Sequence, residues 1–139
     1  MSVFRMKIIL LSTLATMSLH TIEEYVSNLW NQDPFIIWLA QNLNISSINI
    51  YLIIQAIALL LITASLILTI KRRFNLILGV ILGFIFFLEL LHPFNSIKIL
   101  GYYPGLYTGI ILIIIGFFYW KELLAMTAYQ HRQHGSNNL

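Results

Sequence analysis

The chain has 139 residues, of which 59% are hydrophobic and only 9% are charged. Soluble domains carry about a quarter charged residues, so this composition excludes an ordinary soluble domain and indicates an integral membrane protein of one domain. The net charge of +3 does not indicate nucleic-acid binding, because the basic residues are spread over ends and loops. The absence of cysteine excludes disulfides and thiolate-bound metal.

Four apolar segments are long enough to cross a bilayer as helices, since about 20 residues span a ~30 Å hydrocarbon core. They run from Ile8 past Met17 toward Trp30, from Ile50 to Ile70, from Phe74 to Leu91, and from Tyr103 to Trp120. Such continuous runs favour helices over barrel strands. We therefore predict an all-α fold, an integral membrane four-helix bundle in residues 1–125, followed by a polar cytoplasmic tail at 126–139 whose composition is typical of disorder.

The basic residues predict the topology. Arg5 and Lys7 precede the first segment, residues 71–73 separate the second from the third, and Lys121 and Arg132 follow the fourth. The positive-inside rule then places both termini in the cytoplasm of a multi-pass protein, for which we expect a bacterial inner membrane. The N-terminus is similar to a signal peptide, but no small-x-small cleavage site follows, so we expect an uncleaved first span.

The first outer loop contains a predicted short helix. Asp33 followed by Pro34 is a helix-start signal, and the apolar residues after it end in a polar run at 41–44. With Trp30 and Trp38 at headgroup level, this helix is expected to lie in the outer interface. Its role is either a lid over a site or a surface anchor.

Two clusters of ionisable residues interrupt the apolar chain. The first contains His20, Glu23 and Glu24, and the second contains Glu89 and His92. Residues three or four apart share one helix face, so each cluster forms a stripe. Counted at ~1.5 Å per residue from the basic cytoplasmic ends, both clusters lie ~20–28 Å above the inner boundary. We therefore predict that they form one site facing the outer leaflet, where charged groups are rarely kept without a function.

Other polar residues are predicted at the same depth. Gln55 lies in the outer part of the second span, Asn95 follows the second cluster, and Tyr103 and Thr108 begin the fourth span. We expect these four side chains to contact a substrate or to orient the charged groups.

The signature formed by His20, Glu23 and Glu24 resembles the HXXEE family of small multi-span membrane proteins. The segments at 89–92 and 102–105 are also similar to that family. The resemblance covers most of the chain and implies a membrane bundle with a polar site built on the three signature residues. It implies no reaction, because the function of the family is unassigned.

The leading hypothesis for the clusters is a divalent metal centre of zinc, iron or manganese. The predicted ligands are His20, Glu23 or Glu24, Glu89 and His92, because two His with carboxylates suit catalytic zinc and non-haem iron. The extra carboxylate would bridge or act as a general base, so Glu23, Glu24 and Glu89 are the predicted catalytic groups. A full di-metal site would need carboxylates from the other two helices, and none lies at that depth.

The predicted reaction is metal-assisted hydrolysis of a lipid or other amphiphile that enters from the bilayer, with oxidation by iron as competing chemistry. Three alternatives stay open. One is a metal-free acid–base isomerase of a sterol or isoprenoid. The second is proton or cation transport or ligand binding, for which transport by so few spans would require a homo-oligomer. The third is a purely structural role, in which a hydrogen-bonded ion-pair network holds the helices together or the carboxylates of Glu23 and Glu24 are exposed to water.

Overall fold

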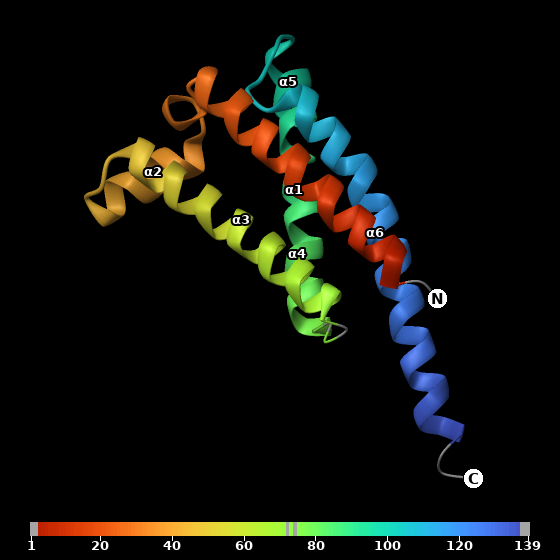
Figure 1. Cartoon of the computed structure of the whole chain (residues 1–139). Coiled ribbons are helices and arrows are strands. Elements are labelled where there is room, and N and C mark those ends of the chain that lie inside the picture. Colours follow the sequence, from red (N-terminus) through yellow and green to blue (C-terminus); the bar gives the residue numbers. More distant parts are fainter. Residues whose placement is uncertain (1–2, 72, 74, 137–139) are drawn as a thin grey trace.

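The chain folds into helices joined by short connections (Figure 1). The structure, a computed structural model, describes residues 3–71, 73 and 75–136. Within these residues it contains no strand, which confirms the all-α prediction. The elements are α1 (Val3–Val26), the 3-10 helix η1 (Leu29–Asn31), α2 (Pro34–Leu43), α3 (Ser47–Ile70), α4 (Leu76–Leu88), α5 (Leu91–Ile99) and α6 (Leu106–Ser136).

Three helical stretches of the described chain are long and apolar enough to cross a membrane. They are Ser47–Ile70, Leu76–Ile99, which combines α4 and α5, and Leu106–Thr127 in α6. The helix α1 is not among them, because charged residues near both of its ends interrupt its apolar stretch. The four predicted helices correspond to α1, α3, the α4–α5 pair and α6. Three of these four have the length and composition of a membrane span.

The helix bounds differ from the predicted spans where local backbone chemistry ends a helix. The first span was predicted to continue toward Trp30, but α1 ends at Val26, before Asn28 adopts a left-handed conformation with φ 56°. The predicted start at Phe74 lies outside the described residues. The fourth helix begins at Leu106 and not at Tyr103, because residues 101–105 form a non-helical connection between α5 and α6.

The predicted short helix is present as α2. Asp33 Oδ1 accepts hydrogen bonds from the backbone N–H groups of Phe35 (2.9 Å) and Ile36 (3.0 Å), so it caps the helix as its position before Pro34 predicts. The buried face of α2 packs against Tyr51 of α3 and its neighbours. The opposite face exposes large apolar side chains, which is typical of an interfacial helix.

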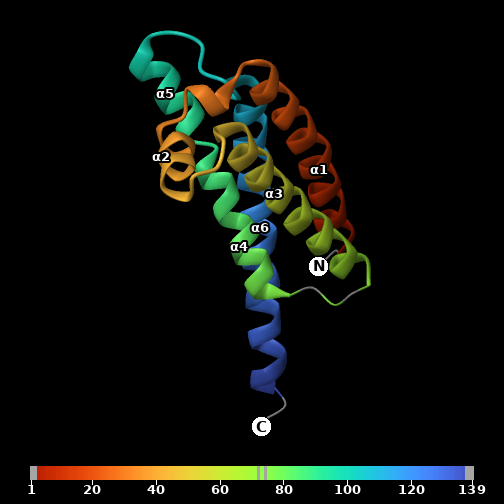
Figure 2. The ribbon, with the colours of Figure 1, turned by 90° about the vertical axis from the view of Figure 1, so that its left-hand side faces the viewer.

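The connections lie at two opposite ends of the molecule. The N-terminus, the α3–α4 connection and the C-terminus lie toward one end, and α2, the end of α1 and α5 lie toward the other (Figure 1). The helix α6 continues past the other helices to Ser136 (Figure 2). The predicted polar tail therefore begins inside α6, and residues 137–139 lie outside the described part.

The helices α4 and α6 approach closely at Gly79 and Gly83, which lie four residues apart on α4, a spacing of small residues that lets helix backbones come together. Tyr119 donates its hydroxyl hydrogen to the Gly79 carbonyl at 2.7 Å, and Trp120 Nε1 donates to the Gly83 carbonyl at 3.1 Å. A Cβ at Gly83 would lie 2.5 Å from the Trp120 ring, so only glycine permits this approach. These contacts fix the register of α4 against α6, and with it the position of Glu89 just beyond the end of α4.

Candidate metal centre

Four buried ionisable side chains converge at the end of the bundle that carries α5. His20 and Glu24 lie one turn apart on α1, Glu89 lies in the turn between α4 and α5, and His92 lies in the first turn of α5. Their exposed fractions are 1%, 2%, 4% and 9% in that order. The structure thus brings together the two polar clusters that the depth count expected to meet.

Each imidazole Nε2 lies close to one oxygen of each carboxylate. His20 Nε2 is 3.1 Å from Glu24 Oε1 and 3.2 Å from Glu89 Oε2. His92 Nε2 is 3.3 Å and 3.6 Å from the same two oxygens. Metal bonds of ~2.0–2.2 Å separated by angles of about 100–110° would place neighbouring donor atoms ~3.1–3.6 Å apart. Each of the four distances is therefore one that two ligands of a single metal ion can have. Among the described residues, the ligand atoms of His20, Glu89 and His92 all lie within 4.8 Å of one another.

The tautomer of His92 follows from its second ring nitrogen. His92 Nδ1 lies 2.6 Å from the carbonyl oxygen of Pro104. A carbonyl oxygen can only accept a hydrogen bond, so Nδ1 carries the proton and donates. In the neutral ring, Nε2 therefore presents a lone pair to Glu24 and Glu89, as a metal-ligating imidazole does when a carbonyl holds its other nitrogen.

The same reasoning applies to His20 through a hydroxyl group. Thr108 Oγ1 donates its single hydrogen to Glu23 Oε2, and His20 Nδ1 lies 2.8 Å from the same Thr108 oxygen. Because that hydroxyl hydrogen is already used, the Thr108 oxygen must accept from His20 Nδ1–H. The lone pair of neutral His20 is therefore also on Nε2, which faces the carboxylates.

Four acceptor atoms consequently face one another in a buried space. Glu89 Oε2 is buried and has no hydrogen-bond partner among the described residues. Buried acceptors without compensation are costly, so the group requires either additional protons, on the imidazoles or on a carboxyl group, or a cation between these atoms. A divalent cation would offset both carboxylates and would satisfy all four atoms, Glu89 Oε2 included.

Glu24 is oriented by a chain of polar groups from α3. Gln55 Nε2 donates to Glu24 Oε2 at 2.6 Å, which leaves Oε1 directed toward the imidazoles. Gln55 Oε1 lies 3.0 Å from Thr21 Oγ1, and Tyr51 donates to the Thr21 carbonyl at 2.7 Å. Gln55, predicted as a contact or orienting group, therefore holds one carboxylate in place.

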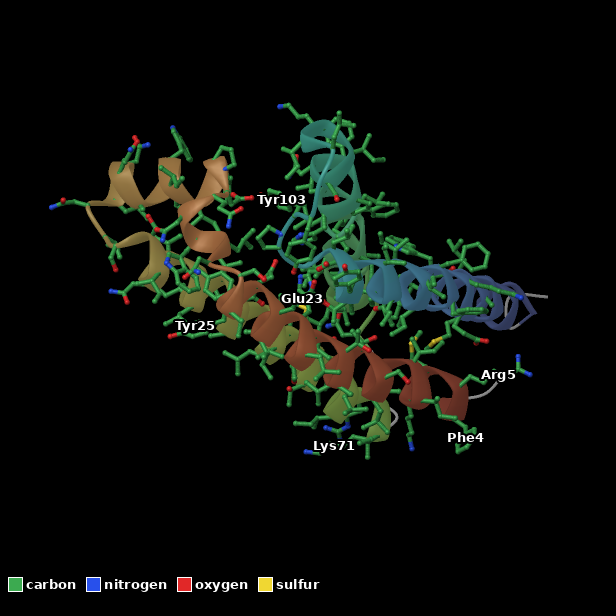
Figure 3. All side chains as sticks on the ribbon, turned by 90° about the horizontal axis from the view of Figure 1, so that it is seen from above. Phe4, Arg5, Glu23, Tyr25, Lys71 and Tyr103 are labelled. Carbon is green, nitrogen blue, oxygen red and sulfur yellow. The ribbon has the colours of Figure 1, made fainter. Side chains whose placement is uncertain are left out.

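Glu23, predicted as a ligand or base, is not brought into this group. Its oxygens accept from the backbone N–H groups of Tyr107 (3.2 Å) and Thr108 (2.9 Å), and from the Tyr102 hydroxyl (2.8 Å). Viewed from the α5 end, Glu23 lies between α1 and the start of α6 (Figure 3). Carboxylates are favourable at helix N-termini, so Glu23 caps α6 and holds Thr108 against His20.

The turn before α6 passes directly over the two imidazoles. Gly105 has φ +82°, and a Cβ at this position would lie 2.7 Å from Cε1 of both His20 and His92. Only glycine tolerates this combination of backbone conformation and close approach. The turn thus supplies both the Pro104 carbonyl and the cover over the rings.

A cavity of about 610 Å³ borders the site. The four ionisable residues line it, together with mostly apolar side chains from η1 and from helices α1 to α5. Cavities of this size hold a small organic ligand, and an apolar wall with few polar groups is typical of binding sites. The site therefore has adjacent space for a largely apolar molecule.

The remaining predicted residues also lie near this space. Asn95 and Tyr103 line the cavity, and the Tyr103 hydroxyl lies 3.2 Å from Asp33 Oδ2. Burial raises the pKa of Tyr103, and the nearby Asp33 carboxylate raises it further, so the phenol remains a donor. Asp33 was predicted only as a helix cap. Its contact with Tyr103 and the contact of the Pro104 carbonyl with His92 are tertiary, and neither has a local sequence signal.

One comparison with known proteins supports the family resemblance that the motif indicates. The family model described as a protein of unknown function with HXXEE motif matches residues 11–120. This range includes all four side chains of the site and confirms the resemblance expected from His20, Glu23 and Glu24. No curated protein and no solved structure matches the chain.

Proposed function

Because this chain belongs to the HXXEE-motif family, whose function is unknown, its activity has to be inferred from the site, and we propose a membrane-embedded metal-dependent hydrolase of a lipid or other amphiphile. The observation that carries the proposal is the convergence of two imidazole Nε2 lone pairs with Glu24 Oε1 and Glu89 Oε2 at 3.1–3.6 Å. Sets of two His and carboxylate are used for zinc and for non-haem iron, and manganese also accepts these ligands.

Three of the residues are the proposed permanent ligands. The ligand atoms of His20, Glu89 and His92 all lie within 4.8 Å of one another. Glu24, which Gln55 holds through its other oxygen, is the proposed fourth ligand or general base. A bound metal would lower the pKa of a coordinated water so that it is a nucleophile near neutral pH.

In the proposed reaction the water oxygen bonds to a carbonyl carbon of the substrate. Glu24 takes the proton of the water and delivers it to the leaving group when the carbon–heteroatom bond breaks. Thr108 and the Pro104 carbonyl keep both imidazoles in the ligating tautomer throughout. Glu23 takes no part in this chemistry, because α6 occupies its oxygens.

The membrane location is part of the proposal. It is supported by the three apolar helices and by the basic residues Arg5 and Lys7 near the start of α1 and Lys71 at the end of α3. The positive-inside rule then places both termini in the cytoplasm and the site toward the outer leaflet. We propose the bacterial inner membrane as the compartment.

Elemental analysis of protein purified without added metal or chelator tests the metal centre. We expect about one zinc, iron or manganese ion per chain in the wild type and little in His20→Gln or His92→Gln. Glu122→Gln is the matched control, because Glu122 pairs with Arg5 away from the site and its loss should leave the metal content unchanged. Absence of all three metals, with no change in thermal stability on chelation, would contradict the proposal.

The reaction is tested on the metal-loaded protein with long-chain esters and amides. Products of hydrolysis that require the metal and disappear in Glu24→Gln would support the proposed chemistry. Oxygen-dependent products in an iron-loaded sample would favour oxidation instead. Activity that persists in the His20→Gln, His92→Gln double variant would exclude both metal reactions.

A further inference from the structure

The charges around the cavity are of one sign. Asp33, Glu24 and Glu89 line it, and none of the described residues that line it is lysine or arginine. A divalent cation at the proposed site would offset Glu24 and Glu89, and the carboxylate of Asp33 would remain. A phosphate or carboxylate head group would therefore meet no lysine or arginine among the described lining residues, and these are the partners that such groups usually require.

The polar groups on the wall suit an uncharged head group. Asn95 is half-buried and offers both a donor and an acceptor, and Tyr103 offers a hydroxyl close to Asp33. Neutral groups such as an ester or an amide can use both kinds of partner. They also place a carbonyl carbon beside the proposed metal without adding negative charge to the cavity.

The apolar part of the cavity reaches the outer surface of the bundle. Four of its lining residues are more than half exposed: Phe35 (60%), Ile57 (52%), Leu88 (60%) and Leu91 (52%). They come from α2, α3, α4 and α5, so exposed lining residues lie on four neighbouring helical segments. In a bilayer, an apolar opening of this kind admits the tail of a lipid directly from the hydrocarbon region.

From these observations we propose that the cavity takes an uncharged long-chain ester or amide, which enters sideways between α3 and α4 and is selected against phosphate-bearing lipids. The proposal rests on the proposed membrane hydrolase and names its substrate class. The head group would lie between Asn95 and the four ionisable side chains, and the chain would leave past Ile57 and Leu88.

Equilibrium binding of two radiolabelled probes tests the head-group selection. The probes share one alkyl chain and differ only in the head, which is an N-alkyl amide in one and an alkyl phosphate in the other. We expect the purified full chain to bind the amide at least ~10-fold more tightly than the phosphate. We expect Asn95→Lys to reduce this ratio several-fold, because it adds the missing cation. Equal binding, or a preference for the phosphate, would overturn the proposal.

A pair of variants on α3 tests the lateral opening. Ile57→Trp enlarges a side chain at the mouth, and we expect it to weaken amide binding ~10-fold. Leu60→Trp is the matched control, since Leu60 is exposed on the same helix and does not line the cavity. Equal effects of the two variants would overturn the lateral route.

Metal analysis of the same samples separates the two proposals. A preference for the amide in protein that binds no metal would support the substrate class and refute the metal hydrolase. Bound metal without any preference between the probes would refute the substrate class alone.

Discussion

His92 Nδ1 lies 2.6 Å from the carbonyl oxygen of Pro104, and this contact directs the lone pair of the other ring nitrogen toward Glu24 and Glu89. The oxygen belongs to the turn between α5 and α6, so a backbone group outside the charged clusters sets the chemistry of a side chain within them. Thr108 has the same effect on His20 from the first turn of α6. Both imidazoles are therefore oriented through Nδ1 by the segment that leads into α6 and by its first turn, and their Nε2 atoms face the carboxylates.

The first prediction concerns Thr108. Thr108→Val removes the oxygen that accepts a hydrogen bond from His20 Nδ1, while valine retains the shape of the threonine side chain. We expect a 10–100-fold loss of metal affinity, as found when groups that orient a ligand are removed, and recovery in Thr108→Ser. Competition with a chelating dye measures the affinity. Thr63→Val, which affects a hydroxyl bonded only to the local Leu59 carbonyl, should bind metal like the wild type.

The second prediction separates the adjacent residues Glu23 and Glu24. Glu23→Gln removes the negative charge at the start of α6, so we expect a loss of ~1–2 kcal/mol in the free energy of unfolding with the metal content retained. Glu24→Gln should instead weaken metal binding, because it removes the negative charge of a carboxylate whose Oε1 faces both imidazoles. Denaturant titration and elemental analysis of both variants provide the measurements. The reverse assignment would show that Glu23, and not Glu24, is the ligand.

Much of the site is predictable from helix geometry. Residues four apart on a helix lie on one face, which is why His20 and Glu24 were expected together. The rise per residue placed Glu89 and His92 at the same depth on another helix. The distances between these four side chains confirm both inferences.

The different structural roles of Glu23 and Glu24 were not predictable from helix geometry. Both residues lie within one turn of His20, so helix periodicity assigns them to the same face. What separates them is the position of the α6 N-terminus, whose N–H groups of Tyr107 and Thr108 bind Glu23. This is a tertiary relationship between residues more than 80 positions apart, and a single sequence carries no signal for it.

The third prediction concerns the pH dependence of stability. Burial and the neighbouring Asp33 raise the pKa of Tyr103 in the folded chain. As pH rises, the unfolded phenol therefore ionises first, so this contribution to stability is complete below the ordinary tyrosine pKa of ~10 and is lost above it. We expect Tyr103→Phe to flatten the decrease in unfolding free energy above about pH 10. Denaturant titrations at a series of pH values measure this decrease, and an equally steep decrease in Tyr103→Phe and the wild type would contradict the prediction.

The fourth prediction concerns Gly105, where the turn before α6 covers the imidazoles. Gly105→Ala would strain a backbone with φ +82° and would place a methyl group 2.7 Å from the rings of His20 and His92. We expect a loss of ~2–4 kcal/mol in the free energy of unfolding, from the strain and the overpacking together. We also expect weaker metal binding, because the rings must separate to admit the methyl group.

Gly101→Ala is the control for this substitution in the same connection. A Cβ at Gly101 would meet its nearest atoms at 3.8 Å and 4.0 Å, which is ordinary van der Waals contact. We therefore expect a change within ~0.5 kcal/mol and an unchanged metal content. Thermal or denaturant unfolding of both variants measures the change in stability, and metal titration measures the change in affinity. If Gly105→Ala bound metal as tightly as Gly101→Ala, the imidazoles would not need their present spacing, and a single ion shared by His20 and His92 would be excluded.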